Sequence, residues 1–188
     1  MKVFKIKNDT NNIQQLQPVD HSKITLERFK FECESKKDSW EEMLYYVNNP
    51  KTKSKNFYSF SSGTLACDDE TLEICRTVFE MSGEILSIQL ENGPKLYVLN
   101  ILECVNGLDY ENTIWDYYDD GTKGRILKYS MHHERILNES TIFKIPETAK
   151  TDIFCYSDIK DPEDEFYYIY KSNNLTGLLF EEVYSSEL

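Results

Sequence analysis

The chain has 188 residues, of which 40% are hydrophobic and 13% aromatic, with only 7 Gly and 5 Pro. This length suits one domain, and the composition supports a packed core and excludes a disordered or fibrous chain. The formal net charge is −12, with a sequence pI near 4.7. An acidic surplus of this size disfavours nucleic acid as a direct ligand, because phosphate binding requires clustered cations.

The charge is unevenly distributed along the chain. Residues 1–55 carry 11 Lys and Arg against 8 Asp and Glu, whereas residues 56–188 carry 10 against 25. No Lys or Arg occurs between Lys95 and Lys123, although six acidic residues lie there. An acidic face of this kind attracts a basic protein partner and accelerates its association. Simple solubility is the alternative explanation, and charge alone does not separate the two.

The N-terminal sequence and the cysteines indicate a compartment. Charges interrupt the chain from Lys2 onward, so we expect no signal peptide, and no run reaches the roughly 18 apolar residues of a membrane span. The five Cys residues are scattered without C-x-x-C spacing, which favours free thiols over disulfides or a zinc site. We therefore expect a cytoplasmic protein that binds no membrane.

The first quarter of the chain predicts few regular elements. Residues 2–7 are typical of a short strand, residues 8–18 of a polar loop, and residues 22–38 are ambiguous. Asp38 and Ser39 precede acidic and apolar residues in an order that predicts a short helix over residues 40–47. A basic, polar connector follows at residues 51–56. It is the one internal boundary, dividing an N-terminal portion of the same domain, residues 1–55, from a compact remainder, residues 56–188.

The remainder carries clearer signals. After a strand at residues 57–60, Asp68 or Asp69 caps a helix whose apolar face contains Leu72, Cys75, Val78 and Phe79. Gly83 stands where a left-handed residue would end that helix. Residues 84–90 and 95–105 then predict a hairpin joined by residues 91–94.

The last third alternates short strands with turns. We expect strands at residues 114–118, 125–129, 141–145 and 152–156, a helix capped by Asp158 that continues through Tyr170, and a closing strand at residues 177–184. Because tight turns join most strands, the sequence predicts an α+β fold, a largely antiparallel sheet with a few helices packed against it.

The search for catalytic and metal-binding motifs is negative. His132 and His133 are adjacent, so their side chains diverge on a strand or a helix, and no H-E-x-x-H occurs. There is no G-x-S-x-G elbow and no phosphate-binding glycine loop. We therefore predict no catalytic residue, no metal ligand and no cofactor.

Tyrosines beside carboxylates offer a different kind of site. An exposed Tyr supplies a large, rigid contact with a polar tip, and it suits the Lys and Arg side chains of a basic partner. A core position is the alternative for any single Tyr. The candidate partner-binding residues are Asp109, Asp116, Tyr117, Tyr118, Asp119, Asp120, Glu163, Asp164, Glu165 and Tyr167. They fall in two segments, residues 109–120 and 161–165 with Tyr167.

The order of motifs from residue 57 onward resembles immunity-protein family eleven of bacterial polymorphic toxin systems. The resemblance covers about two-thirds of the chain. It includes the acidic helix start at residues 68–72, the long strand at residues 95–105, and the F-K-I-P-E run at residues 143–147. The most specific feature is that run paired with the terminal T-G-L-L-F-E-E-V-Y strand at residues 176–184. The chain departs from the family at Asn106, where N-G-L-D replaces a frequent D-A-L-D.

The resemblance implies a small cytoplasmic protein that binds a cognate toxin domain and neutralises it by surface occlusion. A basic nuclease is the toxin that the acidic surface would suit. Two alternatives stay open: an enzyme of unrecognised type, and a regulatory adaptor with no toxin partner. A toxin-like reading frame next to the gene would favour the first interpretation. The sequence names neither the toxin nor the oligomeric state.

Overall fold

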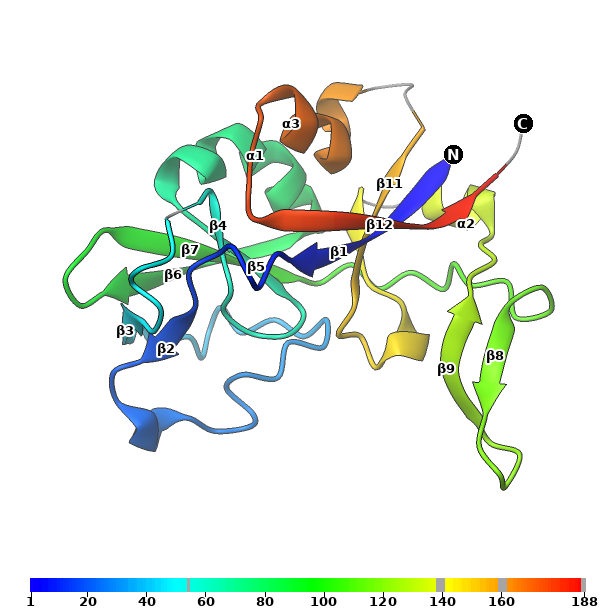
Figure 1. Cartoon of the computed structure of the whole chain (residues 1–188), viewed down its shortest axis with the longest axis horizontal. Coiled ribbons are helices and arrows are strands. Elements are labelled where there is room, and N and C mark those ends of the chain that lie inside the picture. The colour runs from blue at the N-terminus through cyan, green and yellow to red at the C-terminus, as the bar shows by residue number, and fades with distance from the viewer. Residues whose placement is uncertain (54, 138–140, 159–161, 187–188) are drawn as a thin grey trace.

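The computed structural model describes residues 1–53, 55–137, 141–158 and 162–186 (Figure 1). It is an α+β fold whose strands form two main sheets and a separate hairpin, with helices packed against them. The strand pairs are antiparallel apart from β3 with β6, and two isolated bridges, Gln15–Ser59 and Cys104–Lys144, are also parallel. The predicted fold class is therefore confirmed.

The first sheet joins the two ends of the chain. Its order is β10-β11-β1-β12, and every pair in it is antiparallel. The strands are β1 (Lys2–Asn8), β10 (Ile142–Phe143), β11 (Ile153–Ser157) and β12 (Leu178–Ser185). The predicted opening and closing strands are thus confirmed, and they lie side by side in Figure 1. Strand β1 of the N-terminal portion therefore shares a sheet with the C-terminal part of the chain.

The second sheet has the order β2-β3-β6-β7-β5-β4. Its strands are β2 (Leu16–Pro18), β3 (Leu44–Val47), β4 (Phe57–Tyr58), β5 (Thr64–Cys67), β6 (Gly83–Leu90) and β7 (Lys95–Ile101). The β6–β7 hairpin confirms the prediction, although its second strand ends at Ile101 and not at residue 105. Strand β2 occupies the end of the predicted polar loop.

The helix predicted over residues 40–47 is wrong. Its second half is strand β3, in which Tyr45 is fully buried while its neighbours Leu44 and Tyr46 are exposed. This alternation is the period of a strand. Strand β3 receives partners on both sides, from β2 and β6, and these hydrogen bonds override the local helical signals.

Helix α1 (Asp69–Ser82) forms as expected. The Asp68 carboxylate caps it by accepting a 2.8 Å hydrogen bond from the Thr71 backbone N–H, and the predicted apolar face is buried. The expectation for Gly83 is wrong, because its φ of 171° is extended. Glycine is required there by close approach instead: a Cβ would lie 2.1 Å from the Asn100 carbonyl oxygen on β7.

The C-terminal helix is shorter than predicted. A 3-10 turn at Pro162–Asp164 is followed by helix α3 (Phe166–Ser172), and Glu165 between them has extended backbone angles. Asp158 therefore does not cap the helix. The other short elements are η1 (His21–Lys23), α2 (His133–Leu137) and η2 (Pro146–Thr148).

Three apolar clusters hold the fold together. The largest contains buried side chains of α1, α3 and both sheets, for example Phe79, Phe166 and Phe4. A second contains Tyr45 and is covered by residues 29–43. A third contains residues next to the hairpin of β8 (Ile114–Tyr117) and β9 (Lys123–Lys128). No helix among the described residues is both long and apolar enough to span a lipid bilayer.

Candidate functional site

The β8–β9 hairpin projects from the body of the molecule. Strand β8 (Ile114–Tyr117) pairs antiparallel with β9 (Lys123–Lys128), with two register irregularities. Figure 1 shows the two strands extending away from the main sheets. The base is held by an antiparallel bridge between Leu108 and Met131 and by a 2.9 Å hydrogen bond from the Asp109 N–H to the Ser130 carbonyl. These contacts fix where the hairpin points.

The two faces of the hairpin differ. Trp115 and Ile126 are cross-strand neighbours that pack against the third apolar cluster. Four other large side chains of the hairpin and its turn are instead exposed: Ile114 (52%), Tyr117 (58%), Tyr118 (66%) and Leu127 (55%). Natural monomers rarely leave such side chains clustered in water without a function.

Cations on β9 face the acidic strand. Arg125 lies 3.4 Å from Asp116 across the hairpin. The Lys123 ammonium lies 4.7 Å from the ring centre of Trp115 and 5.1 Å from that of Tyr110. The acidic run of residues 103–122 is therefore partly neutralised by the strand that follows it.

Two of the predicted acidic residues shape turns. The Asp109 carboxylate accepts hydrogen bonds from the Asn112 side chain (2.7 Å) and from the backbone of Glu111 and Asn112. The Asp120 carboxylate accepts from the Thr122 hydroxyl (2.6 Å) and N–H (2.9 Å). These bonds lower the pKa of both carboxyl groups because they stabilise the ionised form.

Asp119 is the available carboxylate at the hairpin tip. It is exposed, and within the described part of the chain its side chain has neither an ion pair nor a hydrogen bond. It stands next to Tyr118, whose ring lies over Gly124, where a Cβ would be 3.4 Å from the ring. The tip thus presents two tyrosines and a free negative charge.

A hollow of about 640 Å³ lies at the foot of the hairpin. The Tyr110 hydroxyl donates a hydrogen bond to Glu147 there, which raises the pKa of Tyr110 to about 12. The second Glu147 oxygen, Oε2, is buried and has no partner among the described residues. His132 and Arg135 line the other side. The hollow therefore joins acceptors and donors in a space that a partner side chain could enter.

The second predicted segment is less suited to binding. Glu163 and Asp164 are exposed, but Glu165 is only 4% exposed, and its Oε1 accepts a 2.8 Å hydrogen bond from the Asp158 N–H. The expectation that Glu165 meets a partner is therefore wrong. Tyr167 stacks on Phe4, with ring centres 4.2 Å apart, so it serves the fold. Asp161 lies outside the described residues.

The two acidic segments do not form one surface. In Figure 1, α3 and the hairpin lie in different parts of the molecule. The structure thus brings together residues 109–120 of the predicted site and separates Glu163, Asp164 and Tyr167 from them.

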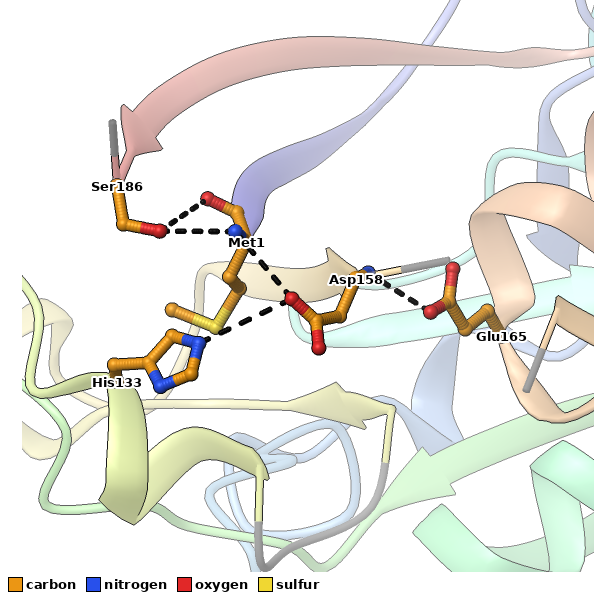
Figure 2. A network of polar contacts seen from close by, with 5 residues as sticks. All are labelled: Met1, His133, Asp158, Glu165 and Ser186. Atoms are coloured by element: carbon orange, nitrogen blue, oxygen red, sulfur yellow. Dashed lines mark hydrogen bonds and ion pairs between the residues drawn. The ribbon is translucent and has the colours of Figure 1, made fainter. Parts of the chain in front are cut away.

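A polar network beside α2 joins both ends of the chain (Figure 2). The Met1 amino group donates to the Ser186 hydroxyl (2.9 Å) and lies 3.4 Å from the Asp158 carboxylate. His133 Nε2 lies 3.9 Å from the same carboxylate. His132, in contrast, lines the hollow by the hairpin, so the two adjacent imidazoles diverge as expected.

This network contains Ser, His and Asp without the geometry of a catalytic triad. The Ser186 hydroxyl contacts Met1 and not His133, whereas nucleophilic catalysis needs a hydroxyl paired with its base. In the ranges described above, no group of three or more His, Cys, Asp or Glu side chains is placed to hold a metal ion.

Sequence reasoning missed the apolar outer face of the hairpin. Ile114 and Leu127 are 52% and 55% exposed, and the sequence K-G-R-I-L-K at residues 123–128 holds no alternation that would signal such a face. No protein-family model and no curated protein matches this chain.

Proposed function

We propose that the protein is a cytoplasmic binding protein that docks a basic partner on the β8–β9 hairpin. The partner would be the toxin domain that the resemblance to immunity-protein family eleven implies. The single observation that carries the proposal is the exposure of Tyr117 and Tyr118 beside Asp119, which is free of ion pairs in the described structure.

This tip has the composition of a binding hot spot. Tyrosine is enriched among the residues that dominate interface energies, because its rigid ring buries much area at a low cost in conformational entropy. Leu127, nearer the foot of the hairpin, adds an apolar side chain that is 55% exposed. The Asp119 carboxylate can pair with Lys or Arg of the partner once the contact excludes water.

The charge of the chain supports a basic partner. Residues 56–188 carry 25 Asp and Glu against 10 Lys and Arg, so the long-range field attracts cations and raises the association rate. Occlusion requires area and complementary charge, and a standard interface covers about 800 Å² per partner. The exposed side chains of the hairpin and the hollow at its foot are the surfaces that would supply this contact area.

An enzyme of unrecognised type and an adaptor without a toxin are the competing functions. An enzyme would use a concave site with convergent titratable groups, and the hollow by Glu147, His132 and Arg135 is where it would lie. An adaptor would use the same hairpin for another partner.

The test is co-expression with the product of the neighbouring gene, followed by affinity measurement. Asp119→Lys and the double change of Tyr117 and Tyr118 to Ser should each weaken binding by about tenfold or more. Asp119 is preferred over Asp116 and Asp120 because the latter two have local partners.

Matched controls exist elsewhere on the surface. Asp38→Lys makes the same charge change at an exposed residue, and Leu26→Ser removes an apolar side chain that is 94% exposed. Both should bind like wild type. If the hairpin variants bind the toxin as tightly as the controls do, recognition lies elsewhere. If the neighbouring product neither binds nor harms cells, the toxin assignment fails.

A further inference from the structure

Three reactive side chains from distant parts of the chain meet beside β10. Cys33 belongs to the segment that covers the second apolar cluster, Cys104 follows β7, and Lys144 follows β10. A parallel bridge joins Cys104 and Lys144, fixed by hydrogen bonds from the Lys144 N–H to the Glu103 carbonyl (2.9 Å) and from the Val105 N–H to the Lys144 carbonyl (2.8 Å). The backbone therefore holds this thiol and this amine in register.

Cys33 lies beside the residue that precedes Cys104. Its Sγ is 3.9 Å from the Glu103 carbonyl oxygen, and the Cys104 side chain adds to the rise that burial causes in the pKa of the Cys33 thiol. Cys33 has a φ of 62°, a left-handed conformation that costs energy for a residue with a side chain. The fold thus keeps a strained residue with its thiol against the backbone next to Cys104.

Lys144 is buried with little to neutralise it. Its side chain is fully inaccessible, and its ammonium donates a 2.7 Å hydrogen bond to the Phe31 carbonyl. Within the described residues it forms no ion pair with a carboxylate. Burial lowers its pKa to about 8, while Cys33, Cys104 and Glu32 act in the opposite direction. A thiolate that forms at Cys33 therefore has a cation nearby that stabilises it.

Accessibility separates this pair from the other cysteines. Cys67, Cys75 and Cys155 are buried, whereas Cys33 and Cys104 are partly exposed. Burial raises the pKa of the Cys33 thiol to about 11, and Lys144 opposes that rise. Partial exposure opens this pair to solvent-borne oxidants, and Lys144 favours the thiolate form of Cys33.

We propose that Cys33 and Cys104 form an oxidisable dithiol, which a peroxide converts to a disulfide while Lys144 stabilises the reacting thiolate. In the first step one thiolate attacks a peroxide oxygen; an S–O bond forms, the O–O bond breaks, and hydroxide leaves, which takes up the proton that the thiol had released to solvent and becomes water. In the second step the other thiol attacks the sulfenic sulfur; an S–S bond forms, the S–O bond breaks, and the departing hydroxide takes the thiol proton as water. The two thiols lose two electrons, which the peroxide gains.

The bond would tie residues 29–43 to the sheet. This segment carries Phe31 and Trp40, which belong to the second apolar cluster. In a reducing cytoplasm all five thiols stay free, so the site changes state only under oxidative stress.

The experiment exposes reduced whole protein to hydrogen peroxide and then counts thiols after denaturation. Five should fall to three, and peptide mapping should find Cys33 joined to Cys104. Cys75→Ala is the control, since it removes a buried thiol and should leave the crosslink intact. Peroxide treatment of urea-unfolded protein should give mixed disulfides, because the selectivity comes from the fold.

Lys144→Met tests the role of the amine. It should slow crosslink formation at pH 7 by about fivefold or more, while the product stays the same. A crosslink between other cysteines, or five thiols remaining after treatment of the folded protein, would refute the dithiol. An unchanged rate in Lys144→Met would refute the role of the amine.

Discussion

Replacing Lys144 with Met should change how the stability of the protein depends on pH. The Lys144 side chain is fully buried, and burial lowers its pKa from 10.5 to about 8. Between these two values the unfolded chain keeps the proton that the folded chain has lost. The unfolded state then binds more protons, so stability rises with pH in this range. Below pH 8 both states are protonated and the cost of burying the charge is fully present.

The magnitude follows from the two pKa values. Relative to a neutral side chain, the buried ammonium costs about 3 kcal/mol at pH 7 and about 2 kcal/mol at pH 9. Met removes this cost, but it leaves the Phe31 carbonyl without its 2.7 Å hydrogen bond, which costs about 1–3 kcal/mol. The two effects nearly cancel at pH 7. The informative quantity is therefore the change with pH: wild type should gain about 1 kcal/mol relative to the variant between pH 7 and pH 9.

Urea unfolding at pH 7, 8 and 9, with reductant present, measures this difference. Contributions from the core tyrosines and from Cys67, Cys75 and Cys155 cancel to first order, because both proteins contain them. Lys128→Met, at an exposed position on β9, controls for the loss of one positive charge. A wild-type-minus-variant difference that is flat across the three pH values would show that Lys144 does not titrate in this range.

Three further predictions concern the fold and the site. Asp68→Ala removes the acceptor for the Thr71 N–H at the start of α1 and should cost about 1 kcal/mol in urea unfolding; no loss would mean that the cap is replaced by water. Gly83→Ala places a Cβ 2.1 Å from the Asn100 carbonyl oxygen and should cost about 3 kcal/mol or more, and a wild-type melting temperature would contradict the β6–β7 contact. Protein purified without added metal should contain no stoichiometric zinc or iron, and elemental analysis that finds either would overturn the expectation of no metal site.

Local signals in the sequence were enough to predict the elements whose stabilising contacts lie within a few residues along the chain. The cap at Asp68, the apolar face of α1 and the turn between β6 and β7 each arise within a few residues. Strand β3 could not be predicted from local signals, because its partners β2 and β6 lie far from it along the chain. Tyr45 could be assigned to a strand only once β6 was in place beside it.

The same distinction holds for the candidate sites. Glu165 belongs to an acidic run that is typical of an exposed surface, yet its side chain is buried and accepts a hydrogen bond from the Asp158 N–H. The meeting of Cys33, Cys104 and Lys144 depends on contacts such as that from Lys144 to Phe31, which are 113 positions apart. No spacing rule joins residues so far apart, so the linear pattern could not predict the cluster.

In the hairpin, strand pairing changes the net charge that an acidic segment presents at the surface. Residues 103–122 contain acids and no cations, and taken alone they predict a strongly acidic face. Antiparallel pairing then places Arg125 beside Asp116 and Lys123 opposite Tyr117, because the strand that follows the turn must fold back on the one before it. The carboxylate of Asp119, which directly follows the exposed Tyr117 and Tyr118, remains unpaired at the tip. Recognition there should therefore depend more on aromatic area than on charge, and the remote acidic surface should affect mainly the rate of encounter.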